Sequence, residues 1–82
     1  MNELIIDGYT FPEWCQKVKT DFLENGYDKM ANDNKFVEKI ADFCWNDVLC
    51  YSLEESLSSI YYTIEEEYNI HIDKENDNTR KN

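Results

Sequence analysis

The chain has 82 residues, with 18 acidic and eight basic ones, so its formal net charge at pH 7 is −10. This charge argues against direct binding to DNA, RNA or anionic membranes, because all three repel a polyanion. The content of 41% hydrophobic and 15% aromatic residues argues against a chain that is disordered throughout. No apolar run is long enough to span a membrane, and no secretory signal opens the chain. We expect one small cytoplasmic domain over 1–72 and a polar tail over 73–82.

The acidic residues are unevenly distributed along the chain. The segment 40–73 has no Lys or Arg, although both signs are normally interspersed on a protein surface. Its eight acidic residues are Asp42, Asp47, Glu54, Glu55, Glu65, Glu66, Glu67 and Asp73.

The first predicted element is a short β-hairpin with strands at about 3–6 and 9–11. Asp7-Gly8 separates two apolar, strand-like runs. This pair is typical of a type I′ turn, because glycine accepts a positive φ without steric cost.

A helix is predicted next, over about 12–24. Thr10 and Glu13 have the spacing of a capping box, and Pro12 suits a first helical turn. Asn25-Gly26 is a typical stop signal. The apolar residues between them recur with helical spacing.

A second helix is predicted over about 35–50, after a loop at 27–34. Asp33 or Asn34 can cap it. Its apolar stripe consists of Phe36, Val37, Ile40, Phe43, Cys44 and Val48.

A third helix is predicted over about 53–68, with Ser52 and Glu55 as its capping box. The alternation at 69–72 allows a short third strand, and the polar residues 73–82 predict a disordered tail. The expected fold class is therefore α+β: an N-terminal hairpin followed by three helices.

The outer face of the predicted helix 53–68 is the strongest candidate for a binding surface. Glu54 and Glu65 are eleven residues apart, which on a straight helix places them about 16 Å apart and within about 20° of each other. Glu55 and Glu66 repeat this relation, and Tyr62 lies between the pairs as a possible anchor. Carboxylates at such intervals on a rigid rod imitate a nucleic-acid backbone. The alternative is an ordinary solvated face.

Three further acidic residues complete the predicted partner-binding set. Asp42 and Asp47 extend the patch if helix 35–50 packs alongside. Glu67 ends the run Glu65-Glu66-Glu67, which a helix 53–68 places in its last turn, where carboxylates oppose the helix dipole. Such placement favours selection on charge rather than on stability.

No catalytic, metal or cofactor site is expected, and the chain is predicted not to be an enzyme. Cys15 and Cys44 fall on apolar stripes, and Cys50 comes at a helix end. The spacing of these cysteines and His71 does not match a zinc site. An odd number of cysteines without a signal sequence favours free thiols in a reducing cytosol.

No motif identifies a family, but the general character of the chain resembles a functional class. Small, strongly acidic cytosolic inhibitors encoded by phages and mobile elements, including anti-CRISPR and anti-restriction proteins, have this size and charge. The acidic helical immunity proteins that neutralise nuclease bacteriocins are also similar, and Ile60-Tyr61-Tyr62 resembles their Tyr-Tyr pair.

The resulting hypothesis is a non-enzymatic inhibitor that acts in the host cytosol as a DNA mimic. Its partner is a basic nucleic-acid-binding protein, either a defence effector or a nuclease, whose phosphate-binding groove it occupies. One alternative is an immunity protein or antitoxin for a cognate nuclease toxin. The other is an acidic adaptor module or homodimer.

Overall fold

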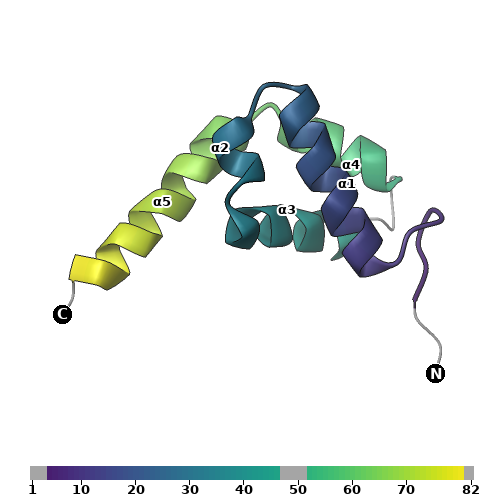
Figure 1. Ribbon diagram of the computed structural model, residues 1–82, viewed down its shortest axis with the longest axis horizontal. Helices are drawn as coiled ribbons and strands as arrows, with labels where there is room; N and C mark the ends of the chain where they lie inside the picture. Colours follow the sequence, from purple (N-terminus) through teal and green to yellow (C-terminus); the bar gives the residue numbers. More distant parts are fainter. Residues whose placement is uncertain (1–3, 47–51, 81–82) are drawn as a thin grey trace.

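Five helices make up the part of the chain that the structure, a computed structural model, describes: residues 4–46 and 52–80 (Figure 1). In chain order they are α1 (Phe11–Glu24), α2 (Asp28–Ala31), α3 (Asn34–Asn46), α4 (Leu53–Ile60) and α5 (Ile64–Arg80). The described part is 76% helical and has no strands, so the predicted α+β class is wrong. None of these helices is long and apolar enough to cross a membrane.

The predicted hairpin is reduced to its turn. Ile6 and Tyr9 exchange two backbone hydrogen bonds of 2.9 Å, and Asp7 and Gly8 between them have φ values of 54° and 86°. These are the positive values that a type I′ turn requires. The pair is an isolated bridge, however, because the apolar side chains of residues 4–5 are more than half exposed. Strands without a buried face are too weak to persist.

Helix α1 agrees with the predicted 12–24 to within one residue, because its end signals act as expected. Glu13 N–H donates to Thr10 Oγ1 at 3.4 Å, and Thr10 N–H donates back to Glu13 Oε1 at 2.9 Å. This reciprocal pair satisfies two backbone donors at the start of the helix. At the other end, Gly26 has a φ of 84°, a value that stops the helix.

Helix α2, a single turn, lies within the segment 27–34 that was predicted to be a loop. Met30 and Ala31 are 4% and 0% exposed, so burial stabilises this single turn against a polar local sequence. Phe36 N–H then donates to Asp33 Oδ1 at 3.2 Å, and this cap starts α3. Helix α3 confirms the predicted helix over 35–46, while 47–50 lie outside the described residues.

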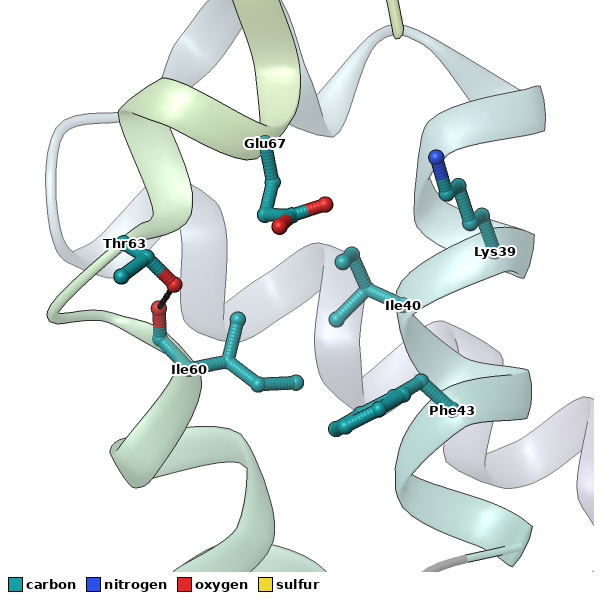
Figure 2. A pocket seen from close by; sticks show the side chains of 6 residues that line it. All are labelled: Lys39, Ile40, Phe43, Ile60, Thr63 and Glu67. Carbon is teal, nitrogen blue, oxygen red and sulfur yellow. Dashed lines mark hydrogen bonds between the residues drawn. The ribbon is translucent and has the colours of Figure 1, made fainter. Parts of the chain in front are cut away.

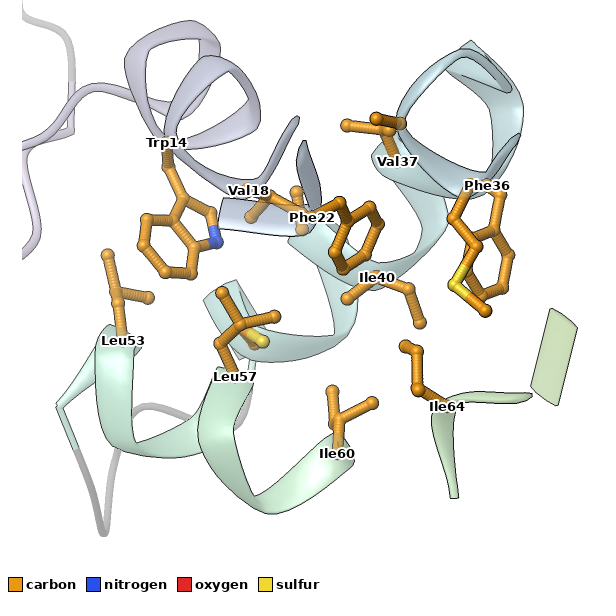
Figure 3. Close-up of a cluster of buried hydrophobic side chains, with 14 residues drawn as sticks. Trp14, Val18, Phe22, Phe36, Val37, Ile40, Leu53, Leu57, Ile60 and Ile64 are labelled. Atoms are coloured by element: carbon orange, nitrogen blue, oxygen red, sulfur yellow. The ribbon is translucent and has the colours of Figure 1, made fainter. Parts of the chain in front are cut away.

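The predicted single helix 53–68 is wrong, because α4 ends at Ile60 and α5 begins at Ile64. Thr63 N–H donates to the Ile60 carbonyl at 2.8 Å, a tight turn that closes α4. Neither Gly nor Pro lies in this stretch. With the chain broken here, Leu57 and Ile60 of α4 and Ile64 of α5 all reach the same core (Figure 3).

Residues 69–80 are helical, so neither a strand at 69–72 nor disorder at 73–80 is present. The alternation failed as a strand signal because His71 is only 8% exposed and packs on Phe36, with ring centroids 5.3 Å apart, whereas Ile70 is 43% exposed. The second half of α5 projects away from the other helices (Figure 1). That 1–72 is the folding unit stays a prediction.

One core lies between the helices, and α5 contributes the least to it (Figure 3). Burial of each large apolar side chain stabilises the fold by about 1.5–3 kcal/mol before entropic costs. The buried apolar residues are Trp14, Val18, Phe22, Met30, Ala31, Phe36, Val37, Ile40, Ala41, Cys44, Leu53, Leu57, Ile60 and Ile64.

Candidate functional site

The first turn of α4 presents two exposed carboxylates, Glu54 and Glu55. Glu55 N–H donates to Ser52 Oγ at 3.1 Å, and Leu53 N–H donates to Asp7 Oδ2 at 2.7 Å. Two caps therefore fix the start of α4, and negative side chains near a helix N-terminus interact favourably with the helix dipole.

The turn between α4 and α5 contains two tyrosines in different surroundings: Tyr61 packs on the protein, whereas Tyr62 is exposed to solvent. Tyr61 OH donates to Asp21 Oδ2 at 2.5 Å, and the Tyr61 ring stacks on Tyr27 with centroids 5.7 Å apart. Burial, followed by the hydrogen bond and the charge of Asp21, raises the pKa of Tyr61 well above its ordinary value. Tyr62 has no comparable hydrogen bond or ring contact within the described residues and is 94% exposed. An aromatic side chain this exposed is available to a partner.

The first turn of α5 contains Glu65, Glu66 and Glu67. The expectation that these carboxylates end a helix is wrong: they begin one, where they interact favourably with its dipole. Their placement is locally stabilising, so it no longer argues for selection on charge alone. Glu65 and Glu66 are exposed, whereas Glu67 is half-buried and faces α3.

An open hollow lies on the outer side of α4 and the following turn. It is lined by Glu55, Ser58, Ser59, Tyr61 and Tyr62. The lining therefore offers one carboxylate, hydroxyl groups and two aromatic rings, and no cation. An arginine guanidinium pairs with carboxylates and stacks on aromatic faces, so this set of groups suits it.

The repeating carboxylate spacing predicted along one rod is lost, because Glu54 and Glu65 are on different helices. The structure instead brings Glu55 and Tyr62 together at one hollow. We call the exposed residues Glu54, Glu55, Tyr62, Glu65 and Glu66, which lie on α4, α5 and the turn between them, the acidic corner. The chain changes direction at this turn (Figure 1).

Three predicted site residues do not belong to the acidic corner. Asp42, on α3, lines a separate hollow that also contains Lys35 and Lys39. Glu67 lines another hollow, and Asp47 lies outside the described residues. The lysines beside Asp42 make its surroundings electrostatically mixed.

The sequence did not reveal a hollow between α3 and the α4–α5 turn, which has a volume of about 130 Å³ (Figure 2). Phe43 was assigned to the core stripe of its helix, but it is 53% exposed at the edge of this hollow. No sequence signal distinguishes it from the buried members of that stripe. The lining residues are Lys39, Ile40, Phe43, Ile60, Thr63 and Glu67.

The described cysteines are at least partly buried, and their surroundings do not form a metal site. Burial, then the charges of Glu38 and Asp42, raise the pKa of the half-buried Cys15 thiol, which keeps it protonated and poorly nucleophilic. Cys44 is buried and Cys50 lies outside the described residues. Over 4–46 and 52–80, no three His, Cys, Asp or Glu residues are grouped to hold a metal ion.

Comparisons with protein-family models, curated proteins and solved structures gave no significant match to this chain. Its function is therefore argued from the chemistry of its own surfaces.

Proposed function

We propose that the protein is a non-enzymatic inhibitor that binds a basic, nucleic-acid-handling protein through the acidic corner. One observation carries this proposal: Tyr62 is 94% exposed beside the Glu55 carboxylate, on a segment, 52–73, that contains no Lys or Arg. Aromatic side chains are enriched as anchors at protein interfaces, and a cluster of uncompensated carboxylates attracts a cationic partner.

The hollow at Glu55 and Tyr62 suits an arginine of the partner. The guanidinium group pairs with the carboxylate of Glu55 while its planar face stacks on the ring of Tyr62. The hydroxyl of Ser58 adds a hydrogen-bond acceptor at the same hollow.

The remaining carboxylates contribute mainly to the rate of encounter. Glu54, Glu65 and Glu66 are exposed, and a formal charge of −10 attracts a cationic surface over about one Debye length. Electrostatic steering of this kind raises association rates more than it raises affinity.

The negative charge of the acidic corner complements a positively charged groove, and this defines the class of partner. Proteins that bind DNA or RNA present Lys and Arg toward phosphates, so their grooves also attract clustered carboxylates. A chain seated there excludes the nucleic acid, which is inhibition of the anti-CRISPR or anti-restriction kind in the cytosol. Because the chain changes direction within the corner, its carboxylates reach two walls of a groove rather than one straight row of sites.

Charge reversal at the corner tests this proposal. The double variant Glu55→Lys/Glu66→Lys and the single variant Tyr62→Ala are compared with wild type. Binding and inhibition are measured against guide-loaded CRISPR effectors, restriction nucleases and nuclease toxins. We expect the wild type to inhibit at least one of them, and the double variant to associate about tenfold or more slowly at low salt.

The matched control is Glu24→Lys/Asp28→Lys, which changes the net charge equally at exposed positions on α1 and α2. The proposal is wrong if both double variants lose binding equally, or if corner variants inhibit as well as the wild type. Inhibition of a nuclease toxin alone identifies the protein as an immunity protein.

A further inference from the structure

The hollow between α3 and the α4–α5 turn has an apolar floor made by Ile40, Phe43 and Ile60 (Figure 2). Its volume is about 130 Å³. A cavity of about 150 Å³ lined by apolar side chains holds one benzene, whereas cofactor pockets are about 300–1,000 Å³. This hollow therefore has room for a single large apolar side chain.

Two opposite charges face each other across this hollow. Lys39 comes from α3 and Glu67 from α5, on opposite walls (Figure 2). Within the described ranges, neither side chain has an ion-pair partner within 4.0 Å. An occupant that carries one charge of each sign beside an apolar side chain would satisfy both.

The chain itself exposes an apolar side chain on α5, the helix that contributes Glu67 to this hollow. Ile70 is 43% exposed on α5, three residues after Glu67. On a helix this spacing places two side chains on neighbouring positions of one edge, about one turn apart. Ile70 and Glu67, which lines the hollow, therefore lie on one edge of α5.

We infer that a second copy of this chain occupies the hollow, and that the two copies form a twofold symmetric dimer. Ile70 of each copy inserts beside Phe43 of the other, and Lys39 of each copy meets Glu67 of the other. In a twofold symmetric dimer, the contact between Ile70 and Phe43 and the contact between Lys39 and Glu67 each occur twice, because the two copies present the same surface to each other. Apolar burial supplies the attraction, and the two charge pairs fix the register.

The net charge of −10 on each copy opposes this association, so the ionic strength must be controlled. At about 0.15 M salt the Debye length is about 8 Å, which screens charges outside the contact. The test is therefore made at that ionic strength with the full chain.

The mass in solution is measured by light scattering and sedimentation equilibrium from about 1 μM to 1 mM. We expect the wild type to approach twice its chain mass of 9.8 kDa as concentration rises. Ile70→Asp and Phe43→Ser are expected to remain monomeric. A wild type that stays monomeric over the whole range overturns the inference.

Charge exchange separates a specific contact from general repulsion. We expect Lys39→Glu and Glu67→Lys each to weaken dimerisation about tenfold, and the combination of both to restore it. Glu67→Lys is the decisive variant, because it reduces the net charge from −10 to −8 and yet should dissociate the dimer. Dissociation constants that follow net charge alone contradict the proposed register.

Lys29→Glu and Glu24→Lys are the matched controls, since they make the same charge changes at exposed positions on α2 and α1. They are expected to leave the dimer intact, and circular dichroism checks that every variant is folded. Because no partner is added, failure of the dimer leaves the proposed inhibitor function untouched, and the reverse also holds.

Discussion

The carboxylate of Asp33 contacts two helices, α3 and α5. Its Oδ1 accepts a hydrogen bond of 3.2 Å from Phe36 N–H at the start of α3, and its Oδ2 lies 3.1 Å from His71 Nε2 on α5. A carboxylate only accepts hydrogen bonds, so the ring nitrogen is the donor. His71 and Tyr68 of α5 also pack on the ring of Phe36, so Asp33 and Phe36 both connect α5 to the start of α3.

Removal of the Asp33 carboxylate is expected to destabilise the fold. Asp33→Ala loses both the helix cap and the bond to His71, which together cost about 1–3 kcal/mol of the free energy of unfolding. Asp33→Asn keeps a capping oxygen and is expected to lose less. Urea denaturation measures both. A result for Asp33→Ala no larger than that for the exposed control Asp28→Ala would show that the attachment is unimportant.

The Tyr61–Asp21 hydrogen bond predicts a loss of stability at alkaline pH. The folded protein raises the pKa of Tyr61 above its ordinary value of 10.0, so the protonated hydroxyl stabilises the folded state fully below about pH 10. This contribution declines as pH rises above 10, because the unfolded state then releases its proton first. The free-energy difference between wild type and Tyr61→Phe is therefore expected to be constant from pH 7 to 9 and to shrink above pH 10. A difference that grows with pH would contradict the assigned direction.

Ser56→Ala is expected to stabilise the protein or leave it unchanged. The Ser56 hydroxyl oxygen is fully buried in α4 and has no hydrogen-bond partner among the residues that the structure describes. An unsatisfied buried hydroxyl costs about 1–3 kcal/mol, and alanine is also the better helix former. Thermal and urea unfolding measure the change, with Ser58→Ala at an exposed position of the same helix as control. A loss of more than about 1 kcal/mol would show that the hydroxyl is satisfied in solution.

A chain that ends at residue 72 is expected to keep the stability of the full chain. Residues 73–80 are helical, but their sequence includes no apolar residue and so offers no hydrophobic face for packing. The truncated chain should lose far-ultraviolet helical signal while its urea midpoint changes little. A large fall in the midpoint would place the C-terminal half of α5 within the folding unit.

The elements that could be predicted are those with strong local end signals. The capping box of α1 formed as expected, Ser52 caps α4 by accepting from Glu55 N–H, and the Asp7-Gly8 turn formed as well. The strands around that turn could not be excluded from sequence, because alternating β-branched residues need a neighbouring sheet before they form one. Helix α2 was missed since burial of Met30 and Ala31, a tertiary effect, overrides its polar local composition.

The candidate site was predicted in its residues but not in its arrangement. The exposure of Glu55, Tyr62 and Glu66 follows from their position off the apolar stripe. Their relative orientation depends on the break after Ile60, which no glycine or proline announces. The hollow beside Phe43 was unpredictable for the same reason, because it exists only where that break places α5 next to α3.

The packing order of the helices also has a kinetic consequence. Helices α1, α2 and α3 pack on one another and are consecutive in the chain, with connections of only a few residues. Contacts between near neighbours close small loops at low entropic cost, and domains built from them fold in microseconds to milliseconds. We therefore expect the first three helices to assemble rapidly, with α4 docking onto a surface already formed and α5 following last.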